Sequence, residues 1–178
     1  MLTYERLATA AAADTIDIAN PADAREIVDY LIDEWVRDYR RTVGRSQIVE
    51  TSTQGFSYLF DLALERLISA WGVSRGRSSH IRDKSRMAGH PLGGGAAYHR
   101  GHAIPHTLGG GTDINLVAQR GSVNIGPFRQ LEREAVASPG SLYFTYWTYG
   151  SGVSQKPIRS QQGLLKPGGK LQLRDHPN

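Results

Sequence analysis

The first 72 residues carry apolar side chains at a helical period in two segments. In the first segment these side chains recur every four residues and form one stripe, with most charged side chains outside it. The stripe consists of Ile27, Leu31, Trp35 and Tyr39. Asn20-Pro21 is a strong helix start and Gly44 is a stop signal, so we predict an amphipathic helix between them.

The second segment runs from Phe56 to Trp71 and is followed by Gly72. Its apolar positions also keep a helical period: Leu59, Phe60, Ala63, Leu67 and Ile68. We therefore predict a second helix here, with these side chains in the core. Together the two segments predict a helical N-terminal region over residues 1–72.

Beyond residue 72 the pattern changes to short β-favouring runs separated by glycine-rich turns. The expected elements are strands at 98–105 and 112–119, a helix at 126–137, a strand at 141–149, and two strands joined by a turn within 162–173. Residues 175–178 are expected to be frayed. This arrangement predicts an α+β fold with an antiparallel sheet.

Charge divides the chain at the same place. Residues 1–72 hold 7 basic and 12 acidic side chains, a net of −5, whereas residues 73–178 hold 14 and 5, a net of +9. We predict an acidic helical region at 1–72 and a basic domain at 73–178 whose surface meets phosphates. A loop expected at 73–95 carries Arg75, Arg77, Arg82, Lys84 and Arg86. Such a charge run is either solvated surface or a contact to nucleic-acid backbone, and we favour contact.

The composition excludes several classes of protein. The chain has no cysteine, so a metal must take oxygen or imidazole ligands. No run of about 18 apolar residues is present, so no membrane span is expected. The alanine-rich stretch from Ala8 to Ala13 is too weakly apolar for a secretory signal peptide. We expect a cytoplasmic chain or one delivered by a specialised secretion system.

Candidate chemistry is concentrated in three short motifs. They are Arg100-Gly101-His102, then Asn115 and Gln119, then Asn124, Phe128 and Glu132. Asn124 lies nine residues after Asn115, and Glu132 lies eight residues after Asn124. These residue types at these offsets resemble the DNA/RNA non-specific endonuclease family, over about residues 96–150. The resemblance implies a ββα-metal core, also called a His-Me finger.

The resemblance and the chemistry of phosphodiester hydrolysis agree on four roles. His102 is the expected general base that takes a proton from the attacking water. Asn124 offers a neutral carbonyl oxygen to Mg²⁺ or Mn²⁺, and one side-chain ligand suffices because Mg²⁺ keeps several waters. Glu132, one or two helical turns later, is placed to hold those waters. Arg100 is expected to neutralise the phosphate.

Two positions depart from the family pattern. His99 stands where the family commonly has Asp before Arg-Gly-His, and Ala118 replaces the Pro before Gln119. His99 either supports the site, by sharing a proton or approaching the metal, or is a neutral surface variation, which we favour. The resemblance gives Asn115 and Gln119 a supporting role, because polar side chains inside an apolar strand are suited to satisfying loop backbone.

Each site residue also has a purely structural interpretation. His102 could be a core histidine, Asn124 a cap for a helix near Gly126, and Glu132 part of a solvated helix face. A metal cluster is a further alternative, disfavoured by irregular spacing: His80, His90, His99, His102 and His106. The glycine triplets at 93–95 and 109–111 lack the Lys-Ser or Lys-Thr of a nucleotide-hydrolase loop.

We therefore predict a divalent-metal-dependent, sugar-nonspecific endonuclease that hydrolyses DNA, RNA or both. Small nucleases of this type often resemble toxins or effectors of bacterial antagonism, so a cognate immunity protein is an expected partner. Two other functions stay open. One is a nucleic-acid-binding module that has lost catalysis, motivated by His99 and Ala118. The other is a structural or immunity-binding protein without a nucleic-acid role.

Overall fold

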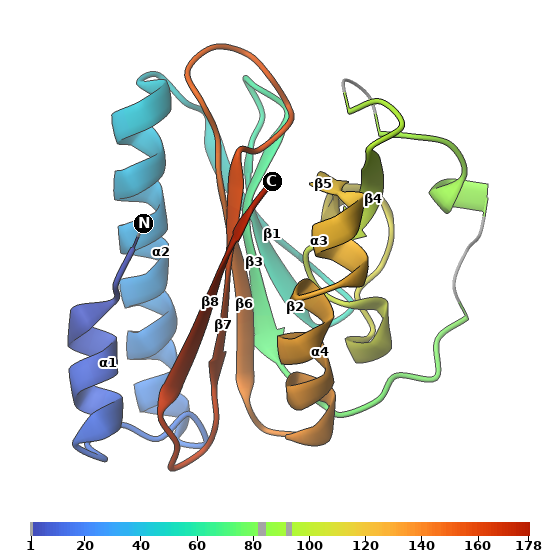
Figure 1. Cartoon of the computed structure of the whole chain (residues 1–178). Helices are drawn as coiled ribbons and strands as arrows, with labels where there is room; N and C mark the ends of the chain where they lie inside the picture. Colours follow the sequence, from blue (N-terminus) through green and yellow to red (C-terminus); the bar gives the residue numbers. More distant parts are fainter. Residues whose placement is uncertain (1, 82–84, 92–93) are drawn as a thin grey trace.

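The computed structural model describes residues 2–81, 85–91 and 94–178, and shows three layers (Figure 1). The middle layer is an antiparallel sheet in the order β1-β2-β3-β6-β7-β8. Its strands are β1 (Ile48–Thr53), β2 (Phe56–Asp61), β3 (Arg66–Val73), β6 (Leu142–Thr148), β7 (Arg159–Leu165) and β8 (Leu171–Pro177). Two helices, α1 (Glu5–Ala12) and α2 (Pro21–Val43), cover one face.

The opposite face carries a smaller unit that consists of two strands and two helices (Figure 1). These are β4 (Tyr98–His102), β5 (Leu116–Arg120), α3 (Gly121–Ile125) and α4 (Phe128–Ala137), with the 3-10 turns η1 (Ser85–Met87), η2 (His106–Leu108) and η3 (Asp113–Asn115). The order strand, strand, helix is the one expected from the sequence. The α+β class and the antiparallel sheet are therefore confirmed.

The helix predicted between Asn20 and Gly44 is confirmed with its capping signals. The Asn20 side chain accepts a hydrogen bond from the Ala22 N–H at 2.9 Å, and Gly44 ends the helix with a φ of 70°. The buried positions are those of the predicted apolar stripe. None of the helices in the described residues is long and apolar enough to cross a membrane.

Trp35 is the centre of the contact between α2 and the sheet. Its ring centroid lies 5.5 Å from those of Trp71 and Phe144, and it stacks on Tyr146 at 6.5 Å. Its indole N–H donates to the Tyr4 hydroxyl at 2.8 Å. Trp35 is fully buried, so one side chain joins α2, β3, β6 and the chain segment before α1.

The second predicted helix, from Phe56 to Trp71, is wrong, because this segment forms β2, a turn and β3. Ten of the fourteen positions of these strands are buried, since helices cover one face of the sheet and the smaller unit covers the other. A strand buried on both faces does not alternate, and its apolar run can imitate a helical period. Gln54 and Gly55, both at positive φ, turn the chain from β1 into β2.

The smaller unit is inserted between two neighbouring strands of the sheet. β3 pairs directly with β6, although about seventy residues separate them in the sequence. Ser74 closes the base of the insertion: its N–H donates to the Ser141 carbonyl at 2.8 Å, and its hydroxyl donates to the Ala135 carbonyl at 2.7 Å. The sheet thus holds both ends of the unit at one point.

The predicted domain boundary between residues 72 and 73 falls inside β3. Of the two strands that pair with β3, β2 comes before this boundary in the sequence and β6 comes after it. The description of residues 1–72 as helical is wrong beyond Val43, where β1, β2 and β3 begin the sheet. The charge division has a structural counterpart, however. Helices α1 and α2 together hold 7 acidic and 5 basic side chains, and they lie on the opposite face of the sheet from the basic unit (Figure 1).

The expected fraying of residues 175–178 is also wrong. Asp175 and His176 belong to β8, and the Asn178 side chain closes this edge of the fold. Its carbonyl oxygen accepts from the Arg120 N–H at 2.7 Å, and its amide donates to the Ala118 and Pro157 carbonyls at 2.9 and 2.8 Å. A terminal asparagine carries no pattern that distinguishes this role from an exposed end.

His176 makes the stability of the fold depend on pH. Its side chain is buried, with Nε2 at 2.9 Å from the side-chain oxygen Oε1 of Gln162, and its ring packs against Phe128. Burial lowers the pKa of His176 from 6.5; Asp175 opposes this shift and Arg174 adds to it. The unfolded chain therefore binds a proton at a higher pH than the folded chain does.

We expect the free energy of unfolding to fall as the pH falls below 6.5 towards the lowered pKa of folded His176. One proton contributes a slope of at most about 1.4 kcal/mol per pH unit. Urea unfolding across this pH range should show a shallower decline of the free energy of unfolding in His176→Gln than in the wild type. The glutamine amide of this variant can still donate to Gln162. Parallel curves for both proteins would contradict this assignment.

Candidate active site

The strand β4 places two of the predicted residues on one face. Arg100 and His102 are two positions apart and therefore point the same way, and they pair with Ala118 and Leu116 of β5. Gly101 between them points to the other face, where a Cβ would overlap the Gln119 side chain. This close approach explains why glycine separates the arginine from the histidine.

His102 lies at the end of β4 with only 7% of its surface exposed. His106 of η2 meets it edge to face, with ring centroids 6.2 Å apart and an interplanar angle of 81°. Both imidazoles line the same cavity. A buried histidine that faces a cavity satisfies the geometric requirement for a general base better than one enclosed in the core.

Asn115 fixes the loop between β4 and β5. Its side-chain oxygen accepts from the Ile104 N–H at 2.7 Å, and its amide donates to the Ile104 and Gly111 carbonyls at 2.8 and 2.9 Å. The fully buried Asn115 side chain therefore satisfies loop backbone, the kind of contact expected from the sequence.

Gln119 does not make the expected contact with loop backbone. Its side chain is fully buried, but neither amide atom has a hydrogen-bond partner among the described residues. The side chain packs against Gly101 instead. The carbonyl of Ala118, one of the two departures from the family pattern, accepts a hydrogen bond from the Asn178 side-chain amide.

Asn124 stands in α3, directly after β5, and lines the cavity with His102. Its amide nitrogen lies 3.4 Å from Nδ1 of His99, which packs over Gly121. This contact occupies the nitrogen end of the amide and leaves the oxygen end for a cation. The alternative of a cap near Gly126 is wrong, because α4 begins at Phe128 and Pro127 precedes it without a side-chain cap.

Helix α4 presents one stripe to the core and another to the cavity. Phe128, Leu131 and Ala135 are buried against the sheet. On the other side of the helix, residues at the complementary helical spacing line the cavity: Arg129, Glu132, Arg133 and Val136. Glu132 thus reaches the same space as Asn124, while the two arginines are exposed at its rim.

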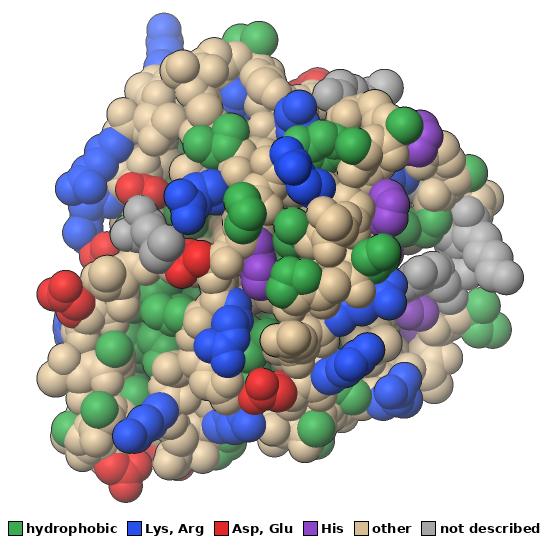
Figure 2. All heavy atoms as spheres, viewed as in Figure 1, with side chains coloured by type: hydrophobic (Ala, Val, Ile, Leu, Met, Phe, Trp, Pro, Cys, Tyr) green, Lys and Arg blue, Asp and Glu red, His purple; other side chains and the backbone are tan. Residues whose placement is uncertain are grey.

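The cavity has a volume of about 360 Å³ and brings together the four residues with predicted catalytic or metal roles. They are Arg100, His102, Asn124 and Glu132. Among the described residues, four arginines and one carboxylate line the cavity, so the site attracts anions. In the view of Figure 2, histidine side chains lie mainly over the right-hand part, where β4, β5 and α4 lie in Figure 1, whereas Lys and Arg side chains are spread over the whole face.

The predicted basic loop contributes unequally. Arg77 lines the cavity, whereas Arg75 lies against Gly55 at the turn between β1 and β2. Arg82 and Lys84 lie outside the described residues, as does the side chain of Arg86, although its backbone forms part of η1. The sequence analysis did not include Arg129 and Arg133 among the site residues. Arg129 lies three residues before Glu132 and Arg133 one residue after it, and this spacing on a helix was the signal that could have placed them near Glu132.

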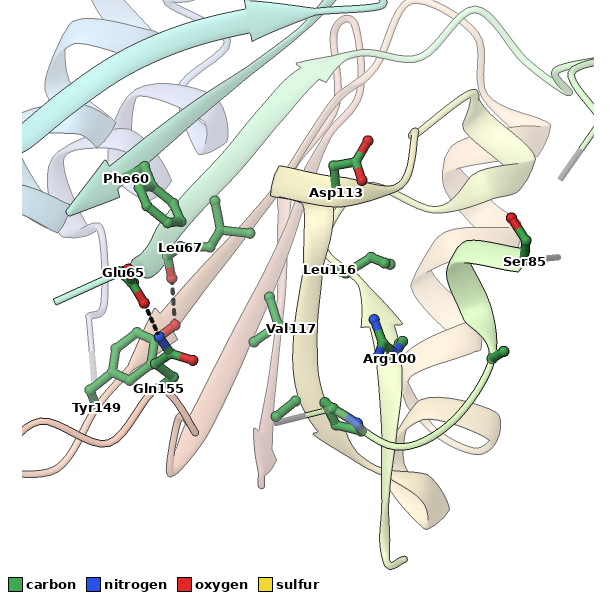
Figure 3. Close-up of a pocket in the computed structure, with 13 residues that line it drawn as sticks. Phe60, Glu65, Leu67, Ser85, Arg100, Asp113, Leu116, Val117, Tyr149 and Gln155 are labelled. Atoms are coloured by element: carbon green, nitrogen blue, oxygen red, sulfur yellow. Dashed lines mark hydrogen bonds between the residues drawn. The ribbon is translucent and has the colours of Figure 1, made fainter. Parts of the chain in front are cut away.

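Arg100 stands between this cavity and a second one of about 390 Å³, which it also lines (Figure 3). The second cavity lies between β5 and the end of the β2–β3 hairpin, where the Gln155 side-chain amide donates a hydrogen bond to the Glu65 carboxylate. The Arg100 Nε is buried and has no hydrogen-bond partner in the described part of the chain. A buried cationic donor of this kind can bind a phosphate oxygen.

The described residues contain no group of three or more His, Asp or Glu side chains that could hold a metal. The alternative of a histidine cluster therefore has no support, and His80 and His90 are exposed outside the cavity. For a hard cation, the described residues of the cavity offer the neutral amide oxygen of Asn124 and the carboxylate of Glu132. Two oxygen donors fit a hard cation that keeps most of its waters, such as Mg²⁺, and not a site closed by protein ligands.

Comparisons with known proteins show the fold. No protein-family model matches the chain, and no curated protein matches it in sequence. Among solved structures, it is similar to NucA from Streptococcus agalactiae, crystallised with no metal bound. The match has a TM-score of 0.52 at 16% identity and covers 82% of this chain and 88% of NucA. The α+β arrangement is thus shared with NucA over most of both chains.

Proposed function

We propose that this chain is a divalent-metal-dependent endonuclease that hydrolyses phosphodiester bonds of DNA, RNA or both. The observation that carries the proposal is the single arginine-lined cavity in which His102, Asn124 and Glu132 meet. The fold that the chain shares with NucA supports it. All of these residues engage phosphate, water or a cation, and none is placed to read a base edge, which favours weak sequence preference.

The chain's own residues divide the reaction among them. Arg100 binds a phosphate oxygen through its partly buried guanidinium and holds the phosphorus near His102, which takes a proton from water as that water attacks. Asn124 would hold Mg²⁺ or Mn²⁺, and Glu132 would hold the waters bound to that ion, which would supply charge stabilisation to the phosphate. His99, at the Asn124 amide, orients that side chain, and Asn115 keeps the loop after His102 in place.

The cation site gives the first test. Asn124→Ala removes the proposed protein ligand, so the Mg²⁺ concentration for half-maximal plasmid cleavage should rise about tenfold or more. His99→Ala, which frees the amide to turn, should raise it less. Cleavage by Asn124→Ala at the wild-type Mg²⁺ requirement would place the cation elsewhere.

The arginines of α4 should govern the salt dependence of binding. On duplex DNA, the plot of log K against log salt falls by about 0.9 for each phosphate neutralised, so Arg129→Ala with Arg133→Ala should make the slope shallower by about 1.8. Arg40→Ala with Arg41→Ala, on α2 across the sheet, is the matched control and should leave the slope unchanged. A slope that is unaltered in the α4 variant would remove these arginines from the interface.

We extend the proposal to a role as a toxin or effector nuclease of bacterial antagonism, held inactive in the producing cell by an immunity protein. An acidic protein that covers the arginine-lined cavity would block the proposed site directly. A catalytically inactive nucleic-acid-binding module is the alternative. The contact of His99 with Asn124 gives that alternative no advantage, because an imidazole beside the amide is compatible with an intact site.

A further inference from the structure

Two histidines, and not one, face the candidate active site. His106 lines the same cavity as His102. The two imidazole rings are in an edge-to-face arrangement, with their centroids 6.2 Å apart. The reaction described above uses only His102. The second imidazole is therefore an acid–base group in the candidate active site that has no role in the reaction proposed so far.

The position of His106 is held from both sides. The three hydrogen bonds of Asn115 tie the loop ends at Ile104 and Gly111, and the Leu108 and Gly110 N–H groups both donate to the Pro105 carbonyl, at 2.9 and 3.0 Å. Residues of η2 also contact α4. A partly exposed histidine on such a braced turn has a defined place relative to His102 and Glu132.

Hydrolysis of a sugar–phosphate ester has a requirement that His102 cannot meet alone. The departing sugar oxygen is strongly basic and needs a proton as its bond to phosphorus breaks, while His102 is occupied in removing a proton from water. The arginines of the cavity do not release protons in proteins. Among the described residues, the remaining acid–base groups that line the cavity are His106 and Glu132. Of these two, the imidazole has the ordinary pKa closer to neutral pH, so it is the group that can carry a proton to donate there.

We propose that His106 is the general acid of this site; the inference rests on the proposed nuclease function. Water forms the new bond to phosphorus and gives a proton to His102. The ester bond to the sugar oxygen breaks, its electron pair stays on that oxygen, and the oxygen takes the proton of His106. One water is consumed, and His102 and His106 exchange protonation states, which solvent then restores.

A substrate whose leaving group needs no proton tests this assignment. Cleavage of a DNA duplex and of bis(p-nitrophenyl) phosphate, which releases p-nitrophenolate, is measured with Mg²⁺ for wild type, His106→Ala, His106→Gln and His102→Ala. His80→Ala is the matched control, an exposed histidine outside the cavity. Thermal unfolding of each variant verifies that it is folded.

Both His106 variants should lose about 10²- to 10⁴-fold in kcat/KM on DNA but less than about threefold on the p-nitrophenyl ester. His102→Ala should lose activity on both substrates. Equal losses of the folded His106 variants on the two substrates, or unchanged DNA cleavage, would overturn the general-acid role and leave the nuclease proposal standing. A wild-type protein that cuts neither substrate would overturn both proposals.

Discussion

Substitution of His102 by Ala is expected to lower the rate of metal-dependent cleavage of DNA and RNA by about 10²- to 10⁴-fold. His102 is the only imidazole at the end of β4, it is mostly buried, and it shares the cavity with Arg100, Asn124 and Glu132. Alanine removes the group that accepts the proton of water. The loss should appear in kcat, measured by gel assay under saturating substrate.

Binding provides the internal control for this variant. The arginines of the cavity remain in His102→Ala, and phosphate contacts dominate affinity for nucleic acid, so Kd in the presence of chelator should change by less than about threefold. His80→Ala should cleave at the wild-type rate. A folded His102→Ala protein with undiminished cleavage would assign the base to another residue.

The largest effect on stability is expected from Trp35→Ala, at about 3–5 kcal/mol of unfolding free energy. The fully buried indole packs on Trp71, Phe144 and Tyr146. Its removal leaves a cavity between α2 and the sheet and deprives the Tyr4 hydroxyl of its indole donor. Urea unfolding at neutral pH measures the change.

Asp33→Ala is the matched control for Trp35→Ala, because it lies two residues earlier in the same helix with its side chain exposed. Its free energy of unfolding should stay within about 0.5 kcal/mol of wild type. A loss below about 1 kcal/mol in Trp35→Ala would show that α2 contributes little to the folded state. That result would favour an N-terminal region separable from the basic unit.

The fold was predictable from sequence where local signals are sufficient. α2 has both a capping asparagine and a terminating glycine, so its ends were found to within one residue. The segment from Phe56 to Trp71 is followed by Gly72, a stop signal that does not distinguish a helix from a strand. Its apolar positions depend on what covers each face of the sheet, which is a tertiary property. The edge strand β1 is mostly exposed and offered no apolar pattern at all.

The candidate site was predictable where residue types at fixed spacing point to one chemistry, as with His102 and Asn124. It was not predictable where a residue matters through its place in space. Arg129 and Arg133 enter the site only because the core stripe of α4 rotates them towards the cavity. The sequence analysis considered His106 only as a member of the disfavoured histidine metal cluster. The loop held by Asn115 places His106 beside His102.

The most direct test of the central claim is incubation of supercoiled plasmid and of total RNA with purified wild-type and His102→Ala protein, each with Mg²⁺ and with chelator. The nuclease account predicts degradation by the wild type with Mg²⁺, and none with chelator or in His102→Ala. Intact nucleic acid in every lane, from folded protein that still binds it, would contradict the account and identify a binding module.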